Sequence, residues 1–256
     1  MKKMVELVDT HAHLTFRSFK KDLDEVIARA KKAGIIFIVN ATVDAKDYLK
    51  ARDLMKKYKG YIYITLGAAP QKLTLEKLDE ILDFIEKYRN EYCAIGECGL
   101  DYYWVKDSEQ REFTKKAFMQ LVEIAKEIDK PLVIHCREAF DDIFDILIKI
   151  KPNVVVFHAF SDKPSNALKI VAHNWYVSIP TIAVRSELHQ NVIKTISLEN
   201  VILETDAPFL SPIPRTRNEP ANVRILAEFI AKIKGMRLEE VASVTTKNAK
   251  KIFNIK

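Results

Sequence analysis

The chain alternates between short apolar runs and longer charged segments, and this alternation constrains the fold most strongly. Eight runs have the length and composition of strands: VELVD (5–9), IIFIVNAT (35–42), YIYITLG (61–67), YCAIGE (92–97), PLVIHC (131–136), NVVVFHAF (153–160), WYVSIP (175–180) and VILETD (201–206). The segments between them have the spacing of amphipathic helices. Strands that alternate with helices predict a parallel sheet with right-handed crossovers. At 256 residues a closed (β/α)8 TIM-type barrel fits best, and an open doubly wound α/β sheet is the alternative.

Two observations refine this prediction. No Gly-rich phosphate loop follows the first strand, which disfavours a dinucleotide-binding open sheet. No linker or low-complexity tract interrupts the pattern, so we predict one domain over residues 1–256. Two extra C-terminal helices, at 228–236 and 238–253, follow the last strand, and we expect both to pack on the outside of the barrel.

The composition is that of a globular protein, with 48% hydrophobic and 30% charged residues. No apolar stretch approaches the roughly 20 residues that span a membrane, and the start of the chain lacks a secretory signal, so we expect a cytoplasmic location. Cys93, Cys98 and Cys136 form an odd set without framework spacing, which predicts reduced thiols. The net charge of +6 permits an anionic partner such as nucleic acid. On charge alone, a Lys-rich solvated surface is the better explanation.

Ionisable side chains stand where several predicted strands end, at the edge where a barrel builds its active site. Four of the six histidines are among them. Burying so many ionisable groups together is costly unless cations compensate them. Six candidates suit two divalent cations that share one carboxylate: His11, His13, Glu97, His135, His158 and Asp206. Such a pair polarises a substrate oxygen and activates water, which favours hydrolysis of a phosphoester, amide or ester.

Other residues near this edge have weaker assignments. Asp9 either supports His11 or packs below it. Cys98 and Cys136 directly follow candidate ligands, so we expect them to face the other way and pack. The guanidinium fork of Arg137 matches a phosphate or carboxylate, which predicts a contact with an anionic substrate; a salt bridge is the alternative. His173 and His189 are assigned no role.

Five motifs, in chain order, resemble the TatD family of metal-dependent deoxyribonucleases: DTHAHL, GECGLDY, PLVIHCREA, FHAFSD and ETDAPFLSP. The later RTRNEPANV and TTKNAKKIF also resemble that family's C-terminal signatures. The resemblance implies an amidohydrolase-like barrel that hydrolyses DNA phosphodiester bonds, as an exonuclease acting from the 3′ end. It implies that His11, His13 and Asp206 hold one metal, His135 and His158 a second, and that Glu97 bridges them. Asp206 would also manage the proton as the bond breaks.

One loop departs from the family pattern. Where the family commonly has Gly-x-His-Pro-His, this chain reads LGAAPQK (66–72), with Gly67 and Pro70 present but Ala69 and Lys72 (or Gln71) in place of the histidines. The loop supplies no candidate ligand, and it leaves the substrate open. DNA is the leading prediction, a small-molecule amide, ester or lactone is the alternative, and a non-catalytic nucleic-acid-binding scaffold is a third possibility. The ligand set suits Mg²⁺, Mn²⁺ or Zn²⁺ alike, and no obligate protein partner is evident.

Overall fold

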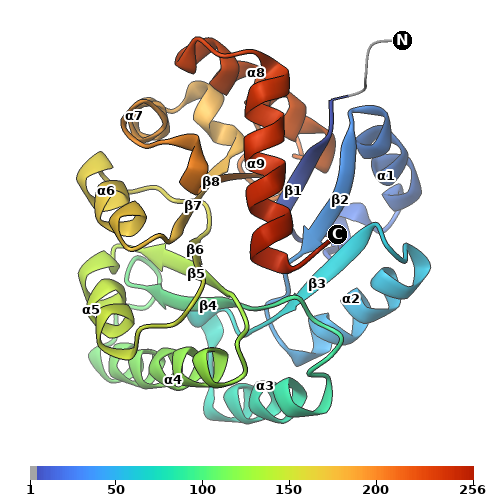
Figure 1. The fold of residues 1–256 in the computed structure, drawn as a ribbon. Helices are drawn as coiled ribbons and strands as arrows, with labels where there is room; N and C mark the ends of the chain where they lie inside the picture. The colour runs from blue at the N-terminus through green and yellow to red at the C-terminus, as the bar shows by residue number, and fades with distance from the viewer. Residues whose placement is uncertain (1–4) are drawn as a thin grey trace.

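Eight parallel strands form one sheet in chain order, as the alternation predicts (Figure 1). The structure is a computed structural model, and it describes residues 5–256. The strands are β1 (Leu7–Ala12), β2 (Ile35–Asn40), β3 (Ile62–Leu66), β4 (Ala94–Asp101), β5 (Leu132–Arg137), β6 (Val155–Phe157), β7 (Tyr176–Pro180) and β8 (Val201–Glu204). β4 continues past its expected end at Glu97, so that Asp101 belongs to the strand.

The barrel closes between β1 and the segment that follows β8. The backbone N–H of Asp206 donates to the carbonyl of His11 at 2.9 Å, and the N–H of His13 donates to the carbonyl of Ala207 at 2.7 Å. Ala12 and Ala207 form a parallel bridge between the same segments. Closure therefore brings the ends of the first and last strands together at one point of the rim.

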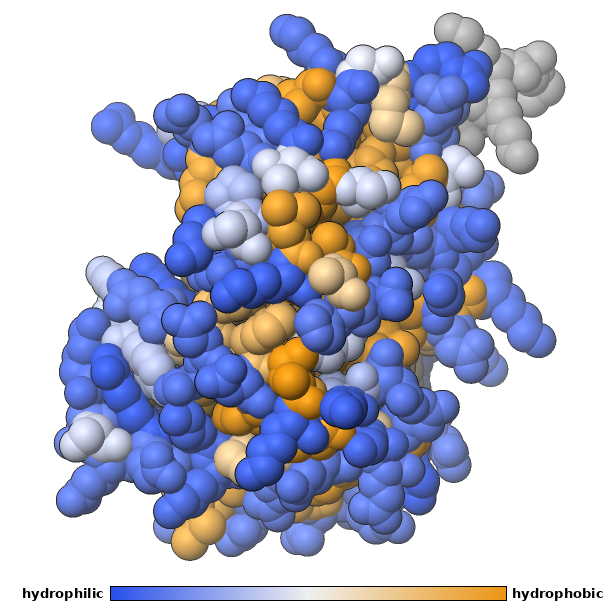
Figure 2. All heavy atoms as spheres, turned by 60° about the vertical axis from the view of Figure 1, so that its left-hand side comes forward, coloured by the Kyte–Doolittle hydropathy of each residue, from blue (hydrophilic) through white to orange (hydrophobic). Residues whose placement is uncertain are grey.

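Helices follow the strands and surround the barrel (Figure 1). They are α1 (Leu23–Lys32), α2 (Ala45–Lys57), α3 (Leu75–Lys87), α4 (Ser108–Glu127), α5 (Phe140–Ile150), α6 (Pro164–Ala172), α7 (Glu187–Thr195), α8 (Val223–Lys234) and α9 (Leu238–Phe253). Short 3-10 helices are η1 (Arg17–Phe19), η2 (Pro70–Lys72), η3 (Thr181–Arg185), η4 (Leu198–Asn200) and η5 (Pro220–Asn222). The face drawn in Figure 2 is mostly hydrophilic, with apolar atoms in a band between charged side chains, as amphipathic helices require. Within residues 5–256, no helix combines the length and apolarity needed to cross a membrane.

The buried apolar residues form two layers. The larger layer lies between the strands and the helices, and it includes Cys98 with Cys136 packed against it, as predicted. The smaller layer fills the barrel interior with residues such as Val8, Phe37 and Val133.

The last helix has a different place from the one we expected. Ala249, Ile252 and Phe253 of α9 pack against the interior layer, and α9 lies across the centre of the ring of strands in Figure 1. A helix here covers apolar side chains that the open end of the barrel would otherwise expose to water. α8 packs on the outside of β1 and β8 as the eighth outer helix, and the first half of α9 joins the larger layer through Val241 and Ala242.

His189 makes stability depend on pH. It is 6% exposed in α7, its Nδ1 lies 2.7 Å from Ser186 Oγ, and burial lowers its pKa to about 4. The unfolded chain takes up this proton near pH 6.5 and the folded chain only near pH 4, so the fold loses stability as pH falls through that window. The unfolding free energy of wild type should therefore fall between pH 7.5 and pH 4.5. In His189→Gln this fall should be smaller by about 2 kcal/mol, as measured by urea unfolding at the two pH values. His173→Gln, at an exposed histidine, controls for the loss of one imidazole; equal losses in wild type and His189→Gln would refute the prediction.

Candidate metal centre

Barrel closure places three of the predicted ligands in contact. His11 Nε2 and His13 Nε2 lie 3.3 Å apart, and His13 Nε2 lies 3.3 Å from Asp206 Oδ1. Glu97 Oε2 approaches from β4, 3.9 Å from His11 Nε2 and 3.8 Å from His13 Nε2. The four side chains present nitrogen and oxygen atoms to one common point, called here the first cluster.

The other oxygen of Glu97 belongs to a second cluster. Glu97 Oε1 lies 2.9 Å from His135 Nδ1 and 3.3 Å from His158 Nε2, and these two nitrogens are 3.3 Å apart. The two oxygens of Glu97 thus face different groups of histidines. All six residues singled out from the sequence therefore meet at one place, and Glu97 joins the two clusters.

The electrostatics suit cations. Burial lowers the pKa of His11 well below its usual range, so its ring is neutral and offers a lone pair. Burial would raise the pKa of Glu97, but His158 and His135 outweigh it and hold that pKa well below its usual range. Burial likewise opposes a charge on His158, yet the carboxylates of Glu97 and Glu204 raise its pKa well above the usual value. The centre therefore buries carboxylates against imidazoles, and they favour a positive charge on His158; a divalent cation bound here would supply that charge in place of the proton.

Asp101 and Gln71 contact His135 from outside the second cluster. Asp101 Oδ2 lies 2.8 Å from His135 Nε2, which orients the ring so that Nδ1 faces Glu97. Gln71, from the loop expected to supply no ligand, donates from Nε2 to Asp101 Oδ2 at 3.0 Å. Neither contact has a signal in the sequence, because the partners lie 30 residues or more apart. The sequence alone identifies Asp101 only as a polar residue near the rim.

Close backbone contacts require a glycine at position 67, in the LGAAPQK loop after β3. A Cβ on Gly67 would lie 2.3 Å from the carbonyl carbon of Gly96 and 2.5 Å from the carbonyl oxygen of Glu97. Such distances are too short for any side chain, so only glycine lets β3 approach the backbone that carries Glu97.

Asp9 supports His11 through the backbone, because its Oδ1 accepts from the N–H of His11 at 3.3 Å. Its carboxylate accepts from the N–H and the hydroxyl of Thr205, at 2.9 and 2.6 Å. Burial raises the pKa of Asp9 to about 8. These bonds tie β1 to the residue that precedes Asp206.

Asn218, within the RTRNEPANV motif, holds the loop after β8. It is fully buried, and its Nδ2 lies 2.8 Å from Thr205 O and 2.7 Å from Phe209 O. Asp206, between these two residues, has a φ of 56°, which few residues other than glycine adopt. The asparagine therefore supports the backbone conformation that aims Asp206 at the first cluster.

Arg137 lies outside the two clusters. Its guanidinium carbon lies 3.8 Å from the ring centroid of Tyr103 and 5.9 Å from that of Trp104. Both aromatic side chains are exposed, Tyr103 by 41% and Trp104 by 63%. The N–H of Trp104 donates to Asp101 Oδ1 at 2.9 Å, which ties this pair to the residue that orients His135. Tyr103, Trp104 and Arg137 form what we call the aromatic platform.

The chain is similar to proteins of one family along almost its whole length. The family described as TatD related DNase matches residues 8–254. Human deoxyribonuclease TATDN3 is 36% identical over 260 residues, which cover 97% of this chain and 95% of that protein. An uncharacterized metal-dependent hydrolase of Methanocaldococcus jannaschii is 38% identical over 251 residues, 97% of each chain. The crystal structure of YJJV, a TatD homologue of Escherichia coli, aligns with this chain with a TM-score of 0.90 at 24% identity. The alignment covers 99% of this chain and 100% of that one, and this likeness supports the barrel fold.

Proposed function

The chain belongs to the TatD family of metal-dependent hydrolases, which act on ester bonds, and we propose that it cleaves DNA phosphodiester bonds with two divalent cations, as an exonuclease. The observation that carries the proposal is the division of the two Glu97 oxygens between two groups of histidines. A carboxylate shared in this way is the arrangement expected of a two-metal hydrolase.

The distances support the assignment of ligands. Atoms about 2.0–2.1 Å from one tetrahedral cation lie roughly 3.3–3.4 Å from each other. The corresponding separations in the structure are 3.3 to 3.9 Å in the first cluster and 2.9 to 3.3 Å in the second. We assign His11, His13, Glu97 and Asp206 to one cation, and Glu97, His135 and His158 to the other.

The chain's own groups then have distinct tasks. Bound cations would polarise the phosphodiester and lower the pKa of water. Asp206 is 13% exposed at its side chain and reaches the edge of the site, so it can accept a proton as the bond breaks. Asp101 keeps the Nδ1 lone pair of His135 directed at the second cluster.

Nucleotide release tests the proposal. Metal-loaded protein should release nucleotides from single-stranded or duplex DNA with Mg²⁺ or Mn²⁺, lose this activity in a chelator, and bind DNA more weakly as salt rises. Cleavage of a small ester, amide or lactone without any release of nucleotides would instead support the alternative substrate class.

The aromatic platform, which includes Arg137, is predicted to bind single-stranded DNA. Exposed aromatic rings beside a cation suit unpaired bases and a phosphate backbone. Trp104 is exposed and Trp175 is only 5% exposed, so we expect single-stranded DNA to quench Trp104 fluorescence. We also expect Arg137→Ala to weaken the Kd from this titration about fivefold or more.

Two variants serve as controls for this titration. Trp104→Phe retains a stacking ring and should remove the signal. Arg89→Ala changes an exposed arginine in the loop that enters β4, at the opposite end of the barrel, and should leave the Kd as in wild type. If Arg137→Ala binds as tightly as Arg89→Ala, the guanidinium does not contact the strand.

A further inference from the structure

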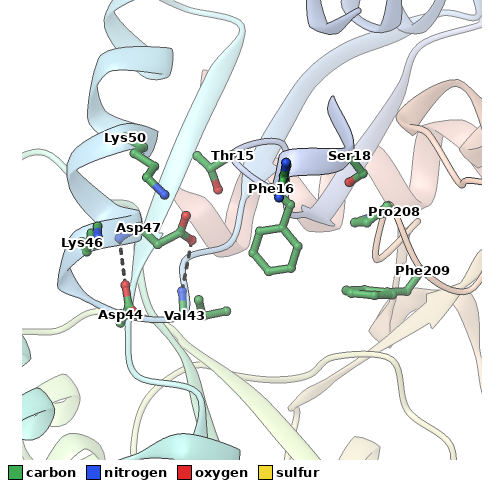
Figure 3. A pocket seen from close by; sticks show the side chains of 11 residues that line it. Thr15, Phe16, Ser18, Val43, Asp44, Lys46, Asp47, Lys50, Pro208 and Phe209 are labelled. Atoms are coloured by element: carbon green, nitrogen blue, oxygen red, sulfur yellow. Dashed lines mark hydrogen bonds between the residues drawn. The ribbon is translucent and has the colours of Figure 1, made fainter. Parts of the chain in front are cut away.

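A cavity of about 570 Å³ is lined by the segments after β1 and β8 and by α2, and two of its lining residues, Phe16 and Phe209, lie beside His13 of the first cluster. Figure 3 shows side chains from three segments around it: Phe16 and Ser18 after β1, Asp47 and Lys50 on α2, and Pro208 and Phe209 after β8. A volume of this size accommodates a small molecule such as a nucleotide. None of the six candidate metal ligands lines this cavity, so the proposed metal chemistry gives it no role.

Two phenylalanines link the cavity to the metal centre. Phe16 stacks on His13, with ring centroids 4.7 Å apart and planes 22° from parallel. Phe209 is 51% exposed, and its N–H donates to the carbonyl of Asp206 at 2.8 Å. The two rings are 6.1 Å apart and nearly perpendicular. A flat apolar group entering the cavity can therefore stack on one ring and meet the edge of the other.

Asp47 gives the opposite wall of the cavity a negative charge. This side chain is 6% exposed; its carboxylate accepts a long bond, 3.4 Å, from the N–H of Val43 and has the hydroxyl of Thr15 as a second donor nearby, which leaves other acceptor positions free. A carboxylate with spare acceptor capacity repels a phosphate but attracts N–H donors of an uncharged group. The exposed side chains of Arg17, Lys46 and Lys50 at the same cavity suit the phosphates of neighbouring nucleotides in a strand.

From these contacts we propose that the cavity binds the nucleobase of the nucleotide whose phosphate lies at the metal centre, and that Asp47 makes it prefer guanine. This inference rests on the proposed function, since it requires a nucleotide substrate. Guanine presents two adjacent donors, N1–H and the N2 amino group, that a carboxylate can accept together. Adenine and cytosine offer one amino donor beside an acceptor nitrogen, and thymine offers one imino donor between two carbonyls.

The test compares the four deoxynucleoside 5′-monophosphates by calorimetric titration. Their phosphates are identical, so differences in Kd report the base. We expect dGMP to bind at least about tenfold more tightly than dTMP, with dAMP and dCMP between them. Equal affinities for all four would overturn the proposal.

Two variants separate the contributions of charge and stacking. Asp47→Asn should reduce the preference for dGMP over dTMP to about threefold or less. Phe209→Ala should weaken all four monophosphates about fivefold or more without changing their order. Asp53→Asn is the matched control, because its 83% exposed side chain lies on the same helix outside this cavity. If Asp47→Asn keeps the full preference for dGMP, Asp47 serves only the first turn of α2. If the Asp47→Asn variant does not fold, the order of affinities in wild type and the effect of Phe209→Ala still test the base pocket.

A base-free substrate distinguishes this proposal from the proposed function. Metal-loaded wild type should hydrolyse bis(4-nitrophenyl) phosphate whatever the cavity binds. Hydrolysis together with equal monophosphate affinities would refute the base pocket alone. Ordered affinities without any cleavage of this diester or of DNA would refute the phosphodiesterase and leave the pocket supported.

Discussion

Glu97→Gln is expected to lower DNA hydrolysis at least about 10³-fold and to leave fewer than two bound metal ions per chain. Each oxygen of Glu97 faces a different group of histidines, so this single substitution weakens both proposed metal sites. An amide keeps the volume of the side chain but offers one neutral acceptor in place of a shared negative charge. Metal content after dialysis, measured by mass spectrometry, and turnover of single-stranded DNA check both parts of the prediction.

Asp101→Asn provides a graded comparison with Glu97→Gln. Asp101 contacts His135 from outside the second cluster, so its loss should cost only about 10–100-fold in activity or metal affinity. Circular dichroism of both variants tests whether the barrel is intact. If Glu97→Gln binds two metal ions and turns over DNA like wild type, the assignment of Glu97 as the shared ligand is wrong.

The six clustered residues could be predicted because parallel strands impose a simple geometry. Each follows an apolar run, and the carboxyl ends of all eight strands meet at one rim. Residues as distant as His11 and Asp206 thus come together without any local sequence signal that pairs them. Their division between two cations came from family resemblance, and the side-chain distances now support it independently.

Features that depend on side-chain packing between distant segments were not predictable. The apolar run before Glu97 ends there, yet β4 continues through Gly99 to Asp101 because its backbone pairs with β5 up to Arg137. The contact of Gln71 with Asp101 depends on the path of a loop whose sequence departs from the family pattern. Amphipathic spacing identifies α9 as a helix but does not say which apolar surface it covers.

Asn218→Ala is expected to lower the unfolding free energy by about 3–4 kcal/mol and also to weaken metal binding. The substitution leaves the buried carbonyl of Thr205 and the partly buried carbonyl of Phe209 without this donor, and each unpaired buried group costs about 1–3 kcal/mol. For a chain of this size the loss corresponds to a decrease in Tm of roughly 6–16 °C. Because these carbonyls flank Asp206, metal affinity should also fall about 10–100-fold. Thermal unfolding and metal titration measure the two effects separately.

Asn248→Ala separates positioning from stability. Asn248 is also a buried asparagine, and its Nδ2 donates to the carbonyls of Leu198 and Val201 at 2.8 Å each. These contacts lie at the start of β8, away from Asp206, so the substitution should lower Tm by a similar amount and leave metal affinity at the wild-type level. If the two variants lose metal affinity equally, the loss reflects general destabilisation. If only Asn218→Ala loses it, the asparagine of the RTRNEPANV motif positions Asp206, because the same donor removed at the other end of the strand has no such effect.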